Sequence, residues 1–131
     1  MKCLADTNVY LAVALDEPER QWLIEATHEA ELIAPRVLPY EIGNAISALV
    51  KRKRVDAEQA MKAWELANSI PVELVEIDVR KALDLAVRLR LYAYDAYFLQ
   101  CALQMRCPLL TLDGTMRRAA AELNIELMEK P

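Results

Sequence analysis

Glycine is almost absent from this sequence of 131 residues, which contains only Gly43 and Gly114. The P-loop and the G-x-G-x-x-G turn of dinucleotide-binding folds both need several glycines close together. These two kinds of nucleotide site are therefore excluded. Histidine occurs once, as His28, and the three cysteines form no C-x-x-C pair. This composition argues against zinc, which is typically bound by grouped His and Cys ligands.

Long apolar runs are also missing, since none approaches the roughly 20 residues of a transmembrane helix. Met1-Lys2 leads directly into an apolar segment, without the hydrophobic core and cleavage site of a secretory leader. We therefore expect a cytoplasmic protein that does not enter a membrane. Cys3, Cys101 and Cys107 are expected to be buried, reduced thiols. His28 is expected on the surface of a helix.

Hydrophobic residues make up 55% of the chain, which is incompatible with intrinsic disorder. No linker, repeat or low-complexity segment interrupts the sequence, so residues 1–131 are predicted to form a single domain. Its net charge of −4 is unusual for a nucleic-acid-binding protein. The distribution of charge matters more than the total, however. A dense basic run spans residues 51–54, and six arginines follow in the second half, namely Arg80, Arg88, Arg90, Arg106, Arg117 and Arg118. Arranged as a rim around a site, these basic residues would attract a phosphate backbone.

Apolar patterning predicts an α/β fold. Strands are expected at residues 2–5, 32–34, 72–77 and 109–112, with a further edge strand at 125–127. Helices are expected at residues 9–15, 18–30, 40–53, 56–68, 78–89, 95–105 and 116–123, with N-caps at Asp56 and Asp78. Strands that alternate with helices favour a mainly parallel sheet covered on both faces. In such sheets, sites form beyond the carboxyl ends of the strands.

Four acids occupy apolar surroundings in this pattern. Asp6 and Asp113 each follow a predicted strand, whereas Glu41 and Asp95 each open a predicted helix on its apolar side. A carboxylate in such a place is costly unless another charge offsets it. Four of them together indicate a hard cation with oxygen ligands, Mg²⁺ or Mn²⁺, and such an ion suits phosphoryl chemistry. For Asp113, capping of the next helix is the alternative explanation.

Four segments, LADTNV (4–9), PYEIGNA (39–45), YDAY (94–97) and LTLD (110–113), resemble the acidic motifs of PIN-domain ribonucleases. More narrowly, the sequence resembles VapC-type toxins of type II toxin–antitoxin modules, over essentially its whole length. The resemblance implies a PIN-like three-layer α/β/α sandwich and metal-dependent hydrolysis of RNA. It implies that Asp6 and Asp95 hold Mg²⁺, while Glu41 and Asp113 help to hold the ion or orient the water. Asn8 and Thr111 match small polar positions that support the first and last acids.

The same resemblance implies partners for the chain. A small antitoxin would place its tail in the active-site groove, and homodimers would form. The apolar helical faces between Pro18 and Leu66 would offer contact surface. Trp22 and Trp64 are candidates for this surface, with ordinary core or half-buried packing as the alternative for each. The last motif departs from the family, because Gly114-Thr115-Met116 follows where many members carry a further acid or an aromatic. One ion and two ions are both compatible with this pattern.

Two other functions fit part of the sequence. Asp6 after a first strand resembles the nucleophile of haloacid-dehalogenase-type phosphatases, but those enzymes carry a second aspartate where this chain has Asn8. A PIN-like module that binds RNA or protein without cleaving is the other alternative. Loss of one or more acids would mark such a module, and all four acids are present.

Overall fold

The central element of the computed structural model, which describes residues 1–129, is a sheet of four parallel strands. The strands are β1 (Lys2–Ala5), β2 (Glu31–Pro35), β3 (Glu73–Val75) and β4 (Leu109–Leu110), in the spatial order β3-β2-β1-β4. The helices are α1 (Thr7–Ala14), α2 (Arg20–Thr27), α3 (Leu38–Lys51), α4 (Ala57–Ser69), α5 (Val79–Leu89), α6 (Ala93–Met105) and α7 (Gly114–Glu122). The predicted α/β class with a parallel sheet is confirmed.

The strand order contains a switch point between β1 and β4. From β1 the chain moves outward to β2 and β3, then returns to the other side of β1 as β4. Leu4 pairs with Ile33 of β2 on one side and with Leu109 of β4 on the other. Ligand sites of open parallel sheets lie beyond the carboxyl ends of the strands at such a point. Asp6 directly follows β1, and Thr111 directly follows β4. Both residues therefore lie at this edge.

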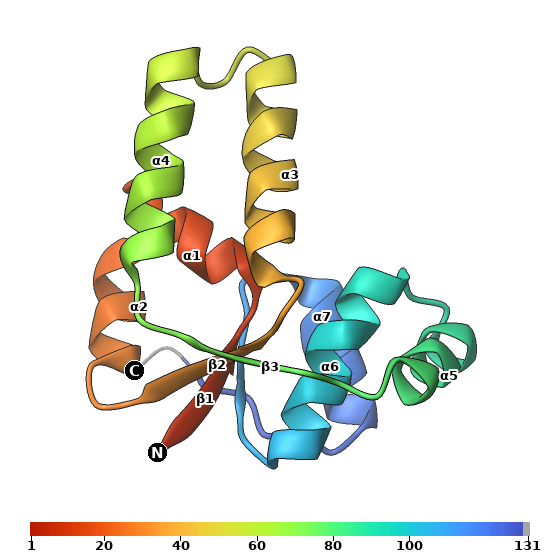
Figure 1. Ribbon diagram of the computed structural model, residues 1–131. Coiled ribbons are helices and arrows are strands. Elements are labelled where there is room, and N and C mark those ends of the chain that lie inside the picture. The colour runs from red at the N-terminus through yellow and green to blue at the C-terminus, as the bar shows by residue number, and fades with distance from the viewer. Residues whose placement is uncertain (130–131) are drawn as a thin grey trace.

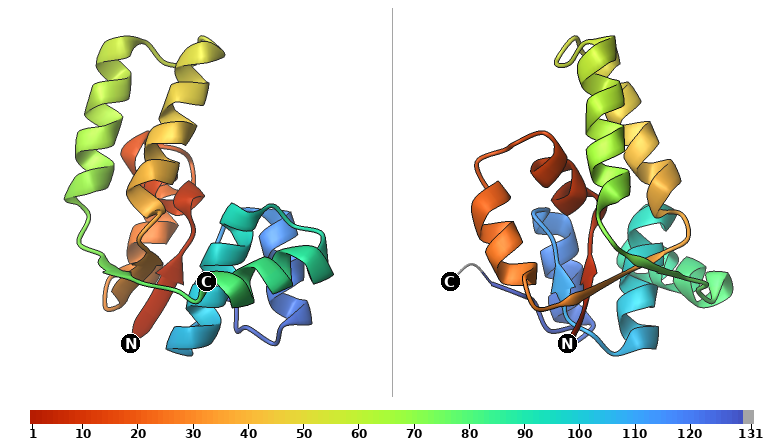
Figure 2. Two further views of the ribbon diagram at one scale, coloured as in Figure 1. Left: turned by 45° about the vertical axis from the view of Figure 1, so that its right-hand side comes forward. Right: turned by 60° about the vertical axis from the view of Figure 1, so that its left-hand side comes forward.

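Helices cover the sheet on both faces, as the three-layer prediction requires. Figure 1 shows α1 and α2 on one side of the strands, with α5, α6 and α7 on the other, and Figure 2 again shows α5 and α6 opposite α1 and α2. The α3–α4 hairpin projects beyond the sheet. No helix within residues 1–129 is long and apolar enough to cross a membrane.

Several elements are shorter than the apolar pattern predicts. The second helix begins at Arg20 and ends at Thr27, because Pro18 and Glu19 form a turn. The strand expected at 72–77 is limited to β3. The edge strand expected at 125–127 is reduced to a single bridge between Leu109 and Leu127. The fourth strand stops at Leu110 because the backbone N–H of Leu112 donates to Asn8 Oδ1 instead of joining the ladder.

Helix starts follow the expected cap chemistry in two places. Asp56 and Gln59 form a reciprocal capping box at the start of α4, with donor–acceptor distances of 2.8 and 2.9 Å. Asp78 accepts a hydrogen bond from the Lys81 N–H at the start of α5. The predicted N-caps at these two residues are thus confirmed.

The core is formed by aliphatic side chains of the strands and of the helix faces that cover them. The three cysteines are buried free thiols, as predicted, and burial raises the pKa of Cys3 and Cys101 to about 12. Both thiols therefore stay protonated and unreactive at neutral pH. His28 is exposed at the end of α2, which confirms its predicted surface position.

Tyr10 of α1 places a polar hydroxyl group inside this apolar core. Its side chain is 1% exposed, and its hydroxyl finds no hydrogen-bond partner among residues 1–129. An unpaired buried hydroxyl costs roughly 1–3 kcal/mol. We therefore expect Tyr10→Phe to raise the free energy of unfolding by about 1 kcal/mol in urea denaturation, while Tyr40→Phe, at an exposed position, leaves it unchanged. A less stable Tyr10→Phe protein would instead mean that the hydroxyl has a partner such as a bound water.

Candidate metal-dependent active site

The four predicted acids meet in one open groove. Asp6, Glu41, Asp95 and Asp113 all line a cavity of about 350 Å³. They come from residues far apart in the sequence and from the starts of four different helices. Thr7, Asn8, Leu11, Asn44, Ala45 and Phe98 complete the lining.

Each acid lies at the N-terminal end of its helix. Asp6 and Asp113 are the N-caps of α1 and α7, whereas Glu41 and Asp95 lie in the first turns of α3 and α6. The N-terminus of a helix carries a partial positive charge and favours a nearby anion. Four helix ends therefore partly offset the charges that the groove collects. Asp113 also caps α7 in the ordinary way, by accepting the Met116 N–H at 3.2 Å, so the structural explanation of this acid applies alongside its place in the groove.

Asp6 is the most constrained of the four carboxylates. Its side chain is 7% exposed. One oxygen accepts the Thr7 N–H at 2.8 Å, and the other accepts the Thr111 hydroxyl at 2.9 Å. A buried carboxylate with charge-assisted hydrogen bonds to both oxygens is held in a single orientation.

Asn8 and Thr111 connect the first acid to the last. The Asn8 amide donates to Asp6 Oδ2 at 3.2 Å and to Thr111 Oγ1 at 3.4 Å, while its carbonyl oxygen accepts the Leu112 N–H. Thr111 Oγ1 in turn accepts the Asp113 N–H at 3.1 Å. The two small polar residues thereby tie the β1–α1 junction to the β4–α7 junction.

The carboxylates of the groove are partly buried and lie close enough to raise one another's pKa. Desolvation by burial is the main cause that raises the pKa of Asp6 to about 6, and the charges of Asp95 and Asp113 raise it further, against hydrogen bonds from Thr111 and Thr7 that lower it. Burial also raises the pKa of Glu41 and of Asp95, each with a contribution from a neighbouring acid. Groups shifted in this direction gain from a cation placed among them.

The donor set fits a divalent cation with a largely aqueous shell. Among residues 1–129, no three His, Cys, Asp or Glu side chains are placed to ligate one ion together. Mg²⁺ usually binds through one or two carboxylates and keeps several waters, so this arrangement suits it. Thr7 adds a buried hydroxyl in the groove lining that lacks a hydrogen-bond partner in the described part of the chain. Such an atom is a natural partner for ordered water or a ligand.

Sequence reasoning missed two polar residues of the groove. Thr7 stands in the first motif without a role, although it follows the N-cap Asp6 and lines the groove. Asn44 is quoted in the 39–45 motif without a role, although it lines the groove one turn after Glu41. Helical spacing from Glu41 is the signal that could have found it.

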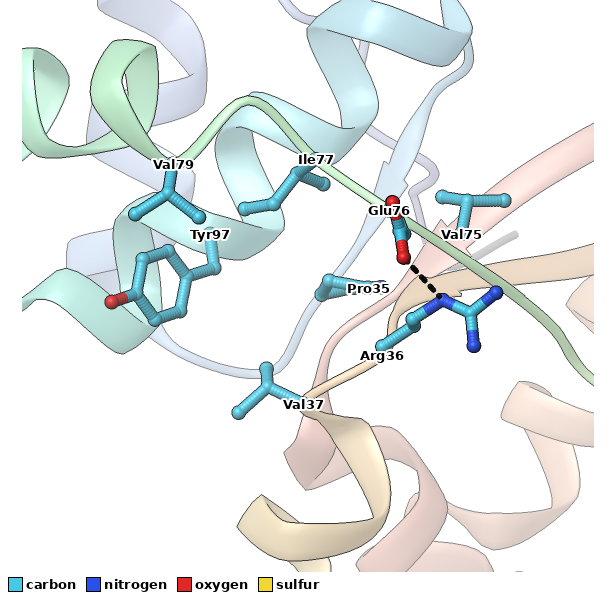
Figure 3. A pocket seen from close by; sticks show the side chains of 8 residues that line it. All are labelled: Pro35, Arg36, Val37, Val75, Glu76, Ile77, Val79 and Tyr97. Carbon is cyan, nitrogen blue, oxygen red and sulfur yellow. Dashed lines mark ion pairs between the residues drawn. The ribbon is translucent and has the colours of Figure 1, made fainter.

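A second pocket, of about 390 Å³, contains none of the four acids. It lies beyond the ends of β2 and β3, where Val37, Val79 and Tyr97 converge (Figure 3). Its polar feature is an exposed ion pair between Arg36 and Glu76 at 3.6 Å. The pocket is otherwise apolar, which suits a packing contact rather than hydrolytic chemistry.

Comparisons with known proteins agree with this geometry. The family model described as "PIN domain" matches residues 3–122. Among solved structures, PAE2754 from Pyrobaculum aerophilum is similar with a TM-score of 0.68 and 23% identity, over 91% of this chain and 79% of that one. VapBC2 from Rickettsia felis, solved bound to a promoter DNA fragment, gives a TM-score of 0.66 and 16% identity over 97% of both chains. A search of curated protein sequences gives no significant match. These two structures share the fold, and the family model covers most of the sequence, so the chain belongs to the PIN domain family.

Proposed function

We propose that residues 1–131 form one domain that acts as a Mg²⁺-dependent ribonuclease, with Mn²⁺ as a possible substitute. PIN domains are generally nucleases. The observation that carries the proposal is the convergence of four carboxylates, from four helix N-termini, in one open groove. RNA is the proposed substrate, and the cytoplasm, where RNA is abundant, is the proposed location.

In this proposal the four acids have two different roles. Asp6 and Asp95 bind the ion, and Glu41 and Asp113 complete its surroundings or orient the attacking water. When bound, the ion supplies water activation and neutralises charge at the phosphate. Thr111 and Thr7 keep Asp6 in place by donating to its two oxygens, and Asn8 keeps Thr111 aligned. Such supporting hydrogen bonds fix the orientation of a ligand before substrate arrives.

The first test is cleavage of a mixed pool of structured and unstructured RNAs with Mg²⁺, with Mn²⁺ and with a chelator. We expect Asp95→Asn to lower the rate by at least about 100-fold, because removal of one preorganised charged group commonly costs that much. Asp84→Asn is the matched control, since Asp84 lies exposed on α5 outside the groove.

The outcomes separate the candidate functions. Metal-dependent cleavage that Asp95→Asn abolishes and Asp84→Asn preserves supports the nuclease. Cleavage that survives both chelation and Asp95→Asn would point to a contaminating enzyme. RNA binding without cleavage would favour the catalytically silent module. The phosphatase alternative loses its basis, because the chain belongs to the PIN family and Asn8 donates to Asp6 where that class needs a general acid.

We further propose that the chain is the toxin of a type II toxin–antitoxin pair. Similarity in fold to VapBC2 supports this assignment. Within the range 18–66 we propose the α3–α4 hairpin as the antitoxin surface, because Met61 and Leu66 are exposed there and a cavity of about 490 Å³ lies between α4 and the end of α1. Trp22 and Trp64 both pack partly buried against the core, which is the packing role expected as the alternative for these two residues.

A homodimer is the proposed oligomeric state. Val79, Leu83 and Val87 form an exposed apolar stripe along α5, at the four-residue spacing that places side chains on one helix face. Val79 also lines the apolar pocket of Figure 3, so the stripe and the pocket form a continuous surface. Light scattering across a range of concentrations would test the dimer, with Leu83→Glu expected to give a monomer.

A further inference from the structure

The basic run Lys51–Arg54 does not form a rim around the acidic groove. Instead it occupies the turn between α3 and α4, at the far end of the hairpin from the sheet (Figure 1). All four side chains are exposed. None of them takes part in an ion pair with another residue among 1–129, although the chain as a whole is acidic. Four adjacent cations without an ion-pair partner in the described part of the chain form a local positive surface, although Arg54 lines a cavity together with Asp16 and Glu17. Such a surface attracts a polyanion.

One face of α3 joins this basic turn to the groove. Glu41, Asn44 and Ala45 line the groove at the start of the helix. A rotation of 100° per residue places Ala48 and then Arg52 on the same side as Glu41, two and three turns further along. Arg52 is the C-cap and directly follows Lys51, the last residue of α3, so its Cα continues the helical phase. The face carries no large apolar side chain between the groove and the turn.

The distance between the acidic groove and the basic turn matches the length of a short stretch of nucleic acid. The eleven residue steps from Glu41 to Arg52 correspond to about 16 Å at about 1.5 Å per residue. Stacked nucleotides rise about 3.4 Å each along one strand, so about five nucleotides would span the distance. The Debye length is about 8 Å at physiological salt, and the cations of the turn are therefore largely screened from the acids of the groove.

Three exposed tyrosines close in sequence to the groove acids favour an unpaired strand. Tyr40 directly precedes Glu41, Tyr94 directly precedes Asp95, and Tyr92 is the N-cap of α6. Each is at least half exposed, and the Tyr94 ring also packs edge-on against Tyr97. Aromatic rings in such positions are stacking surfaces for bases that are not paired. Duplex RNA keeps its bases stacked inside and would not use them.

We propose that the basic turn Lys51–Arg54 is a phosphate-binding site for single-stranded RNA, which runs along α3 into the acidic groove. This inference rests on the proposed ribonuclease function and extends it by naming a phosphate-binding site outside the groove and the footprint of the substrate. The turn positions RNA and has no part in hydrolysis. Long substrates would use it, whereas oligonucleotides too short to reach it would not.

The test removes three charges from the turn in the variant Lys51→Gln/Arg52→Gln/Lys53→Asn. Asparagine replaces Lys53 because its φ is 58°, a left-handed conformation that asparagine tolerates. Arg54 is kept, since it lines the cavity beside α4. A control variant removes three exposed charges elsewhere, Lys2→Gln/Arg88→Gln/Arg106→Asn. A third variant, Lys51→Arg/Arg52→Lys/Lys53→Arg, exchanges the side chains but keeps the charge.

Binding of a labelled, unstructured RNA of about twenty nucleotides is measured by fluorescence anisotropy over a salt series, in an Asp95→Asn background that prevents turnover. We expect the turn variant alone to weaken binding at low salt by about tenfold or more, and to lower the salt slope by about 2, since each single-strand phosphate contact contributes roughly 0.7. With Asp95 restored, its kcat/KM should fall for the long RNA and stay unchanged for an oligonucleotide of about three nucleotides.

The outcomes are distinguishable from failure of the ribonuclease itself. If RNA binding depends on the turn but the unmodified protein does not cleave RNA, the basic-turn site is supported and the proposed ribonuclease function is wrong. Equal binding by the turn variant and the control variant, with cleavage intact, would overturn the basic-turn site alone. Equal affinity for a duplex of the same sequence would overturn the single-strand assignment. If the turn variant loses affinity for a polyglutamate peptide and not for RNA, the turn is a protein-docking surface and the proposal is wrong.

Discussion

Replacement of Asp6 by asparagine is expected to abolish cleavage and, in a chelator, to make the protein more stable. The first effect follows from the proposed role of Asp6 as an ion ligand, and a loss of at least about 100-fold is expected. The second follows from the position of this carboxylate, which is buried and faces the like charges of Asp95 and Asp113. A residue that costs stability and supports the chemistry is typical of a functional site.

The size of the stability effect follows from the pKa of Asp6. Its pKa is raised from 3.8 to about 6 in the folded protein, so the folded state holds this proton more tightly than the unfolded chain does. Stability is therefore lost as pH rises from about 4 to about 6, and the full cost, on the order of 3 kcal/mol, is present at pH 7. Asparagine removes the charge, but its side chain has only one acceptor oxygen, whereas Thr7 and Thr111 donate to two different oxygens of Asp6. The lost hydrogen bond offsets part of the gain in stability. We expect a net increase of about 1–2 kcal/mol at pH 7.

Urea denaturation from pH 4 to 7.5, in chelator and in Mg²⁺, measures both effects. The difference between the two proteins should grow with pH in chelator, because only the unmodified protein carries the Asp6 carboxylate. Mg²⁺ should then stabilise the unmodified protein, by about 2.7 kcal/mol at 100 times its Kd, and leave Asp6→Asn almost unaffected. Asp84→Asn serves as the control and should follow the unmodified protein throughout. A destabilised Asp6→Asn in chelator, with no pH dependence of the difference, would contradict this account.

The fold was largely predictable because its elements carry strong local signals. Strand β1 and the helices capped by Asp56 and Asp78 follow directly from apolar periodicity and cap chemistry. The ends of the strands were not predictable from periodicity, since Thr111 and Leu112 continue the apolar alternation. Their backbone leaves the sheet because Asn8, 104 residues earlier in sequence, accepts the Leu112 N–H. Contacts of such sequence separation have no signature in a local pattern.

The candidate site was predictable in its acids and less so in its surroundings. A carboxylate next to apolar residues is a local anomaly, and this is why Asp6, Glu41 and Asp95 could be identified from the sequence. The strand order explains why Asp6 and Asp113 meet, because the pairing of β1 with β4 places Asp6 beside Thr111, which contacts Asp113. The location of the basic run could not be foreseen, since it depends on how far α3 extends beyond the sheet.

Replacement of Thr111 by valine is expected to lower both stability and activity, although the side chain keeps its shape. Thr111 is buried, donates to Asp6 Oδ2 at 2.9 Å and accepts the Asp113 N–H at 3.1 Å. Valine fills the same volume but leaves both of these partners short of a hydrogen bond. Hydrogen bonds to charged groups are worth roughly 1.5–3 kcal/mol, so a loss of about 2 kcal/mol is expected. Loss of a group that orients an ion ligand commonly costs 10–100-fold in activity or metal affinity.

The pH dependence distinguishes this role from simple destabilisation. The Thr111 hydroxyl lowers the pKa of Asp6, so valine should raise that pKa above about 6. Because Asp6 must be ionised to bind a cation, the acid limb of the rate profile should move to higher pH, and the deficit should be larger at pH 6 than at pH 8. The Mg²⁺ concentration needed for half-maximal rate at pH 6.5 should rise for the same reason. Thr111→Ser retains the hydroxyl and should keep the original profile despite the cavity left by the lost methyl group. A uniform loss of rate at every pH, shared by valine and serine, would assign Thr111 to packing alone and leave Asp6 to be held by Thr7 and Asn8.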